Sequence, residues 1–338
     1  MERVVGSYEK YLFEYYKAKQ KYEAQISRAE DKLHLRPIML NNEETSSMAK
    51  RSIKIGIITA LEKEYAAVKK LLKNVKQLYF EGNGAGHRFL LGEIASANEG
   101  IHTVALGLCG MGNNKAALRV SDMSRHFPEL ESIIMVGIAG GVPAPENLEE
   151  HVRLGDIVVS EGIVQYDFGK ETEDKWLCRS VPAKPSAKLL EAVSMMKIEE
   201  FEDDYVWKNY IDQYAKEKFA RPTSEDILHG LKGEIIPHPE DATRDNYPKV
   251  FYGTIASANT LLKNYAHRKK LQEQFSIRAV EMEASGIADA SWNAEIGYLV
   301  VRGICDYCDI YKNDAWQNYA AMIAACYTRD LIEHLPSF

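Results

Sequence analysis

The 338-residue sequence has few cysteines and no long apolar run. Its five cysteines are odd in number and sparse, which favours a reducing compartment over a disulfide scaffold. No run of 18 apolar residues is present, so we expect no membrane-spanning helix. The first twenty residues alternate charges with tyrosines and lack the apolar core of a signal peptide. We therefore expect a cytoplasmic protein without a membrane partner.

An excess of positive charge is also absent. The chain has 42 Lys+Arg against 49 Asp+Glu, a formal net charge of −7. Proteins that bind nucleic acid usually carry a basic balance, so we expect no nucleic-acid partner. Hydrophobic residues make up 46% of the chain and charged residues 27%, which is ordinary globular composition and excludes wholesale disorder.

Residues 1–50 differ in pattern from the rest of the chain. Apolar residues and tyrosines between Tyr8 and Leu33 recur at steps of three, four or seven, with Lys and Glu between them. This pattern predicts one amphipathic helix over about residues 4–33, ended by Arg36-Pro37 and followed by a polar linker. Packing on the body or a dimer contact is the favoured interpretation. A free coiled coil is the less favoured alternative, and a docking segment for a regulatory partner is a further possibility.

From residue 53 onward, short β-branched runs alternate with helical stretches. Several runs are apolar throughout, as in strands that are buried on both faces. The pattern predicts an α/β fold with a mixed, mainly parallel sheet flanked by helices. Residues 170–250 break the alternation, so we predict a domain over 51–338 with an insertion there that contains helices near 184–197 and 204–218. The predicted strands are 53–59, 102–108, 132–140, 156–160 and 297–304, and the predicted helices are 61–73, 113–126, 259–274, 283–293 and 314–334.

Candidate chemistry follows the strands, because ligands in such folds bind at the carboxyl ends of strands. Glu64 follows the first strand, where an acid either complements a helix dipole or activates water. Gly110 and Gly112 open a helix whose N–H groups could hold an anion or a sugar hydroxyl. Glu281 and Glu283 stand one residue apart, so both carboxylates share a face if this segment is extended.

The late segment VRGICDYCD (301–309) places Arg302 within a strand and Asp306 just past its end. Cys305 and Cys308 form a C-x-x-C pair, but the other cysteines offer no second pair for zinc. A redox pair would open a helix after an early strand, and this one comes late among acids. We therefore expect no metal and no cofactor.

Seven segments, taken together and in order, resemble the nucleoside phosphorylase/nucleosidase superfamily, and most closely its methylthioadenosine/S-adenosylhomocysteine nucleosidase branch. They cover roughly residues 53–335 and include IKIGIITALEKEY (53–65), GLCGMGNNKAA (107–117), IIMVGIAGG (133–141), RLGDIVVS (153–160), GTIASANTLL (253–262), AVEMEA (279–284) and VVRGICDYCD (300–309). The forms VQYDFGK (164–170), ARPTSED (220–226) and GTIASAN (253–259) resemble a subgroup fused to signalling or immune-type proteins. Members of that subgroup cleave ATP at the N-glycosidic bond in bacterial anti-phage systems.

The resemblance implies a role for individual residues. Glu64 matches the carboxylate that positions and deprotonates the attacking water, and Arg302 the arginine that supports this water site. Glu283 matches the acid that holds the ribose hydroxyls, with Met282 packed under the sugar. Asp306 matches the acid that protonates purine N7. The other substrate contacts that the resemblance implies are Cys109, Gly110, Ala139, Gly140, Leu261, Val280, Glu281 and Cys305.

Some positions depart from the family pattern. Cys305 and Cys109 stand where serine is usual, Asn259 where aspartate is common, and Leu261 where the nucleosidases stack phenylalanine on the base. The recognition of the base and of the 5′ substituent therefore stays open. Phosphorylases place an arginine in the first loop to hold phosphate. Here that loop is acidic, which favours water as the nucleophile.

The predicted function is hydrolysis of an adenine nucleoside or nucleotide at its N-glycosidic bond. ATP is the favoured substrate, giving adenine and ribose 5′-triphosphate, and an anti-phage effector is the favoured context. The alternatives are a methylthioadenosine/S-adenosylhomocysteine nucleosidase, a phosphate-dependent purine nucleoside phosphorylase and a non-catalytic nucleotide sensor. The resemblance also implies a homo-oligomer. Four cations of the insertion are candidate phosphate contacts: Arg221, Lys232, Arg244 and Lys249.

Overall fold

The computed structural model describes residues 53–80, 88–96, 98–173 and 176–336. The helix predicted over residues 4–33 and the linker after it lie outside the described residues. Within the described ranges, no helix has both the length and the apolar character that crossing a membrane requires.

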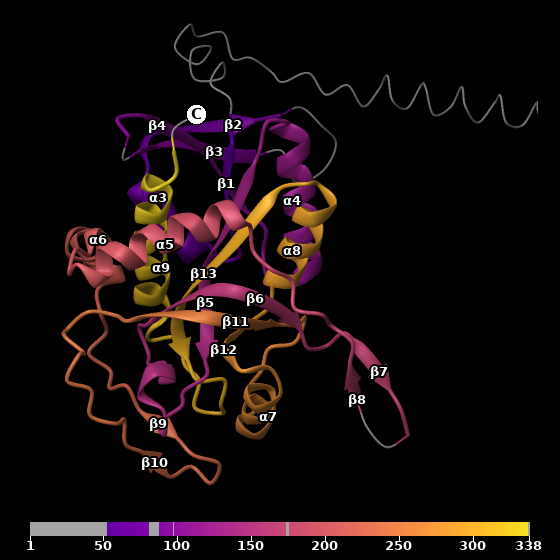
Figure 1. The fold of residues 1–338 in the computed structure, drawn as a ribbon, viewed down its shortest axis with the longest axis vertical. Helices are drawn as coiled ribbons and strands as arrows, with labels where there is room; N and C mark the ends of the chain where they lie inside the picture. Colours follow the sequence, from indigo (N-terminus) through magenta and orange to yellow (C-terminus); the bar gives the residue numbers. More distant parts are fainter. Residues whose placement is uncertain (1–52, 81–87, 97, 174–175, 337–338) are drawn as a thin grey trace, which may run out of the picture.

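A nine-stranded mixed sheet organises the described residues (Figure 1), in the order β12-β11-β6-β13-β5-β1-β4-β3-β2. The central pairs β4–β1, β1–β5 and β5–β13 are parallel, and the edge pairs β2–β3 and β3–β4 are antiparallel. The strands are β1 (Ile55–Thr59), β2 (Lys73–Tyr79), β3 (Arg88–Ala95), β4 (Ile101–Leu108), β5 (Ser132–Gly141), β6 (Ile157–Gln165), β11 (Val250–Ser257), β12 (Ile277–Glu281) and β13 (Gly297–Asp306).

One end of the sheet closes on itself. β12 pairs in parallel with β11 and also in antiparallel with the end of β5, where Val280 lies opposite Gly140. Strands β5, β13, β6, β11 and β12 therefore form a ring. This closure brings the carboxyl end of β12 next to the carboxyl ends of β5 and β13, although these segments are far apart in the sequence.

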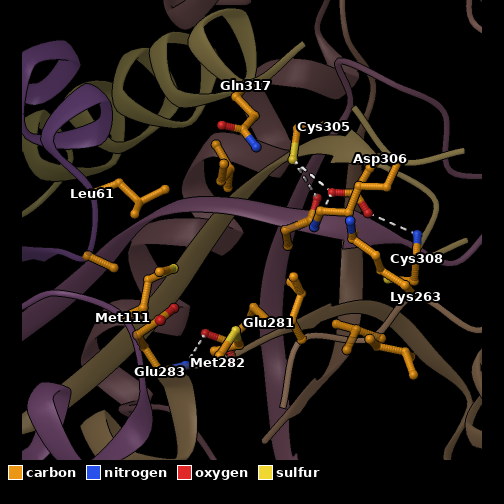
Figure 2. Close-up of a pocket in the computed structure, with 18 of the residues that line it drawn as sticks. Leu61, Met111, Lys263, Glu281, Met282, Glu283, Cys305, Asp306, Cys308 and Gln317 are labelled. Carbon is orange, nitrogen blue, oxygen red and sulfur yellow. Dashed lines mark hydrogen bonds and ion pairs between the residues drawn. The ribbon is translucent and has the colours of Figure 1, made fainter. Parts of the chain in front are cut away.

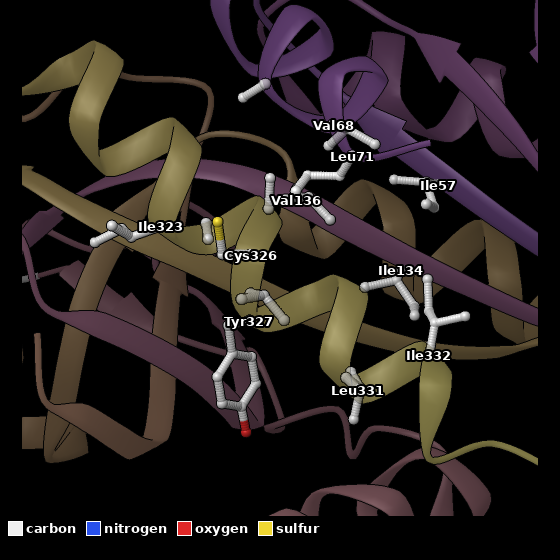
Figure 3. Close-up of a cluster of buried hydrophobic side chains, with 14 of the residues drawn as sticks. Ile57, Val68, Leu71, Ile134, Val136, Ile323, Cys326, Tyr327, Leu331 and Ile332 are labelled. Atoms are coloured by element: carbon white, nitrogen blue, oxygen red, sulfur yellow. The ribbon is translucent and has the colours of Figure 1, made fainter. Parts of the chain in front are cut away.

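Helices cover both faces of the sheet. One buried cluster joins the sheet to α3 (Glu62–Leu71), α5 (Ala187–Phe201), α6 (Val206–Tyr214) and α9 (Gln317–Glu333). Figure 3 shows part of this cluster, with Val68 and Leu71 of α3 facing side chains of the sheet and of α9. A second cluster joins the other face to α4 (Asn113–His126) and α8 (Ala284–Asn293). A third holds α7 (Tyr265–Phe275) against β12.

The five predicted strands and four of the five predicted helices lie close to their expected positions. The helix expected over 259–274 was wrong at its start: α7 begins at Tyr265, and residues 258–264 form a loop. Sequence reasoning did not predict β2, β3, β11 and β12. β2 is a largely exposed and charged edge strand, so it lacks the apolar run that marked the central strands.

The helices of the region 170–250 pack against the sheet. Helices α5 and α6 contribute Leu189, Val193 and Trp207 to the main core. The rest is mainly irregular chain, with the 3₁₀ turn η2 (Glu217–Phe219) and short hairpin strands β7 (Gly169–Glu171), β8 (Trp176–Cys178), β9 (Leu228–His229) and β10 (Ile235–Ile236). Another 3₁₀ turn, η1 (Leu148–Glu150), precedes β6.

Candidate active site

A cavity of about 240 Å³ lies at the carboxyl ends of β1, β5, β12 and β13. Figure 2 shows acidic side chains reaching this cavity from two sides: Glu281 and Glu283 from β12 and the start of α8, and Asp306 from β13. Most of the residues proposed from the sequence line it, namely Glu64, Ala139, Gly140, Leu261, Val280, Glu281, Met282, Glu283, Cys305 and Asp306.

Glu64 is held in the first turn of α3, where it is 1% exposed. Its carboxylate accepts hydrogen bonds from the backbone N–H groups of Ala60, Leu61 and Ile138, each at 2.8 Å. Burial raises the pKa of Glu64, and the charge of Arg302 and the three N–H donors oppose that shift. Glu64 is therefore fixed in position and takes up a proton more readily than an exposed glutamate does.

Arg302 lies between three glutamates and is completely buried. Its Nη2 donates to Glu281 and, at 3.2 Å, to Oε2 of Glu283. Its Nη1 lies near Gly137 of β5, where an added Cβ would collide with both Arg302 and Glu64. Burial works against the charge of Arg302, but the three glutamates raise its pKa above the usual value. Glycine at position 137 thus allows the guanidinium and the carboxylate to approach the same point of β5.

The two glutamates of the AVEMEA segment have different partners. Glu281, at the end of β12, accepts hydrogen bonds from the N–H groups of Glu283 (2.9 Å) and Ala284 (2.9 and 3.1 Å), so it satisfies donors at the start of α8. Glu283 Oε1 accepts from the N–H of Gly112 at 2.9 Å. Burial raises the pKa of Glu283 to about 7, an effect that Arg302 opposes and Glu281 reinforces. Glu283 can therefore exchange a proton near neutral pH.

Asp306 ends β13 and is 4% exposed. Its Oδ1 accepts from the N–H of Cys308 at 2.9 Å, and its Oδ2 accepts from the Cys305 thiol at 3.2 Å. Oδ2 also forms an ion pair with Lys312 Nζ at 2.7 Å. A Cβ on Gly140 would collide with Cys308 Sγ and would lie 2.8 Å from Asp306 Oδ1, so glycine at this position leaves room for both side chains.

Three of the proposed residues do not line the cavity: Cys109, Gly110 and Arg302. The Cys109 thiol has one hydrogen to donate and lies within hydrogen-bond distance of the carbonyls of Thr59 (3.3 Å) and Gly110 (3.1 Å). Burial, together with Glu283 and Glu64, raises its pKa to about 12, so it is a neutral thiol. Gly110 has φ +82°, a conformation that favours glycine. Met111, which follows Gly110 in the sequence, does line the cavity.

The sequence model of the phosphorylase superfamily matches residues 54–329. This range contains every strand of the sheet and all the acids described above. The chain belongs to this superfamily.

Several individual proteins are similar to the chain in sequence. A nucleotide-binding leucine-rich repeat (NLR)-like protein of Hyaloscypha variabilis is 30% identical over 306 residues, covering 85% of this chain but 30% of that protein. The 5′-methylthioadenosine/S-adenosylhomocysteine nucleosidase of Mycobacterium tuberculosis is 24% identical, covering 84% of this chain and 98% of the relative. ATP nucleosidase Cap17 of Escherichia coli is 25% identical, covering 82% and 50%. The chain thus spans half or less of two of these relatives.

Solved structures show the same fold. The S-adenosylhomocysteine nucleosidase of Streptococcus pyogenes has a TM-score of 0.58 at 19% identity, covering 86% of this chain and 100% of its own. The futalosine hydrolase of Helicobacter pylori has a TM-score of 0.57 at 18% identity, covering 84% and 99%.

In this superfamily member the four insertion cations proposed from the sequence do not line the cavity. Arg244 pairs with Asp156 at 2.5 Å, Lys249 pairs with Asp241, and Arg221 donates to a backbone carbonyl. Sequence reasoning missed the lysines that do line it, Lys263 and Lys312. Both lie in loops, where no periodicity indicates the direction of a side chain.

The C-x-x-C pair behaves as part of the packed interior. Cys305 and Cys308 are each 3% exposed and form no disulfide. Burial and the neighbouring Asp306 raise the pKa of both thiols above the usual value. Both are therefore neutral thiols at pH 7, and Cys305 serves as a hydrogen-bond donor to Asp306.

Proposed function

We propose that this superfamily member hydrolyses the N-glycosidic bond of an adenine nucleoside or nucleotide and releases adenine. One observation carries the proposal: three carboxylates from separate segments, Glu64, Glu283 and Asp306, line one cavity with different partners. Different partners give carboxylates different proton affinities, which is how one site holds both a base and an acid.

The glutamate end of the cavity suits a sugar that gains positive charge while the base departs. Breaking a ribosyl C–N bond passes through a sugar with positive charge, and fixed negative groups stabilise that charge. Three buried glutamates there share one arginine, Arg302. Glu64 is the general base in this proposal, because it is fixed by three N–H donors and its pKa is raised.

The opposite end of the cavity suits the base. Adenine leaves poorly as an anion, so protonation by a general acid accelerates its departure. Asp306 is the acid that we assign to this step. The side chains of Leu261, Leu262 and Val280 also line the cavity and offer apolar surface to a flat ring. Met282 and Glu283 also line the cavity, and in this proposal the ribose lies against them.

Water, rather than phosphate, is the nucleophile in this proposal. A phosphate dianion at Glu64 would meet three carboxylates, and the single guanidinium beside them is fully buried and paired. The N–H groups of Ala60 and Leu61, which could hold an anion at the start of α3, already donate to Glu64. Like charges at this range repel, so phosphate binds poorly there.

ATP is the substrate that we favour, with ribose 5′-triphosphate as the second product. The relative named ATP nucleosidase Cap17 supports this choice. Lys263 also supports it, since it lines the cavity and has no ion pair with the described residues. Methylthioadenosine is the second candidate, because the mycobacterial nucleosidase matches this chain over 98% of its own length. An anti-phage effector role, a homo-oligomer and a regulatory partner stay predictions.

The test is to incubate the full chain with ATP, AMP, methylthioadenosine and S-adenosylhomocysteine, with and without phosphate, and to measure free adenine by chromatography. We expect adenine from ATP at a rate that does not depend on phosphate. Ribose 1-phosphate as the product would instead identify a phosphorylase. Binding of ATP without adenine release from any of the four compounds would contradict the proposal and identify a nucleotide sensor.

Residues 1–50 are proposed to serve assembly or restraint of the activity. Removing them and comparing the two chains by size-exclusion chromatography and by adenine release tests this idea. Unchanged assembly and unchanged activity would contradict it.

A further inference from the structure

A buried ion pair at the base end of the cavity is not explained by the proposed acid role of Asp306. Lys312 Nζ lies 2.7 Å from Asp306 Oδ2, and their side chains are 15% and 2% exposed. Lys312 comes from the loop between β13 and α9 and lines the cavity. In this pair the ammonium is the hydrogen-bond donor and the carboxylate is the acceptor, so the proton between them belongs to Lys312 Nζ.

Among the described residues, the other charged and titratable groups around this pair form no ion pair with Asp306. Cys305 and Cys308 are thiols with raised pKa values. Arg268 of α7 donates to the Tyr307 carbonyl, and Asp309 accepts from the N–H of Tyr311 at 2.9 Å. Lys263 and Asp314 line the same cavity without an ion pair to Asp306. The immediate counter-charge of Asp306 is therefore the ammonium of Lys312.

We propose that Lys312 is a positioning residue that stores the proton required by the leaving base and delivers it through Asp306. This inference rests on the proposed function. When the C–N bond breaks, its electron pair moves to the base, which becomes far more basic. The proton moves from Lys312 Nζ to Asp306 Oδ2, and the Asp306 carboxyl group protonates a ring nitrogen of the base.

The step balances without a further reactant. The attacking water forms the new C–O bond at the sugar and gives its proton to Glu64. Lys312 is left as a neutral amine and regains a proton from solvent after the products leave, while Glu64 returns its proton to solvent. One water is consumed, and the empty site recovers its original charges.

Two variants separate proton storage from mere anchoring of Asp306. Lys312→Arg keeps a positive partner for Asp306. The new guanidinium cannot supply a proton, because it does not deprotonate in proteins. Lys312→Met removes both the partner and the proton. Lys197→Met is the control, because Lys197 forms an exposed ion pair with Glu161 away from the cavity.

The experiment measures kcat/KM for adenine release from ATP and from methylthioadenosine between pH 5 and pH 9, with thermal unfolding of each variant. We expect the unmodified chain to stay active to the alkaline end. Lys312→Met should approach it at pH 5 and lose up to about tenfold per pH unit as the pH rises, because no ammonium is left to supply the proton. Lys312→Arg should be about 10²-fold slower throughout, as expected when a general acid is lost.

Two results would overturn the inference. One is an Arg variant as active as the unmodified chain, which would mean that charge alone suffices. The other is a Met variant whose pH profile runs parallel to that of the unmodified chain, which would mean that Asp306 needs no stored proton. Absence of adenine from the unmodified chain would instead refute the proposed function, so the two failures are distinguishable.

Discussion

The two ends of the cavity differ in how their buried carboxylates are neutralised. At one end three glutamates share Arg302, so negative charge is in excess. At the other end Asp306 faces its own ammonium, that of Lys312, and the charges are balanced. Excess negative charge favours proton uptake and stabilises a nearby cation. In the balanced pair, Asp306 raises the pKa of Lys312 against the effect of burial, so the ammonium keeps its proton in the empty site. The difference indicates where a base and an acid would act.

Replacing Glu64 by Gln is the change with the largest expected effect on this comparison. Gln cannot take a proton, and its amide group cannot accept from all three N–H donors that now bind the carboxylate. Adenine release should fall by about 10²–10⁴-fold. Glu62→Gln, two residues away and exposed, serves as the control. Activity within threefold of the unmodified chain, measured as kcat (roughly 0.6 kcal/mol), would contradict a base at the glutamate end.

Replacing Arg302 by Met tests the shared charge itself. The change leaves buried carboxylates without their cation, and breaking a buried pair in this way typically costs about 3–5 kcal/mol. We expect a loss of that size in the free energy of unfolding, measured with urea.

Arg125→Met is the matched control for Arg302→Met. Arg125 pairs with Asp122 at the surface, where side-chain exposures are 49% and 21%. Such pairs contribute about 0–1 kcal/mol. Equal losses in the two variants would mean that the buried guanidinium does not hold the glutamates together.

The raised pKa of Glu283, about 7, predicts a pH dependence of stability. The folded chain retains the Glu283 proton up to about pH 7, whereas the unfolded chain releases it near the ordinary value of 4.5. Folding therefore binds a proton between these values, and the contribution of this group falls as pH rises through about 7.

Urea unfolding at pH 5 and pH 8 checks this prediction. We expect the unmodified chain to lose more stability between these pH values than Glu283→Gln does, since Gln cannot ionise. Glu149→Gln, an exposed substitution, should behave like the unmodified chain. Equal losses in the unmodified chain and in Glu283→Gln would contradict a raised pKa at this end.

The smallest expected effect concerns Lys263. If a triphosphate extends along the cavity wall, Lys263→Met should raise KM for ATP by about tenfold, the scale of one charge-assisted hydrogen bond. KM for methylthioadenosine should not change, because it carries no phosphate. Lys232→Met in the insertion, which does not line the cavity, should affect neither value. Equal shifts for both substrates would refute a phosphate contact.

Much of the fold could be predicted from the sequence, because the buried central strands are apolar runs and their flanking helices have regular periodicity. The edge strand β2 was missed for the converse reason. Most residues of β2 are exposed, and Lys73 and Lys76 interrupt the apolar run that would have indicated a strand. The start of α7 was misplaced because the apolar pair Leu261 and Leu262 belongs to the cavity wall and not to a helix.

The sequence by itself determined which acids follow which strands, since Glu64, Glu283 and Asp306 are read directly from short motifs. Only the tertiary structure decided their partners. The antiparallel contact of β12 with β5 brings the glutamates to Arg302, and a loop places Lys312 on Asp306. Local periodicity carries no information on such long-range pairings, and the proton affinity of a carboxylate depends on them.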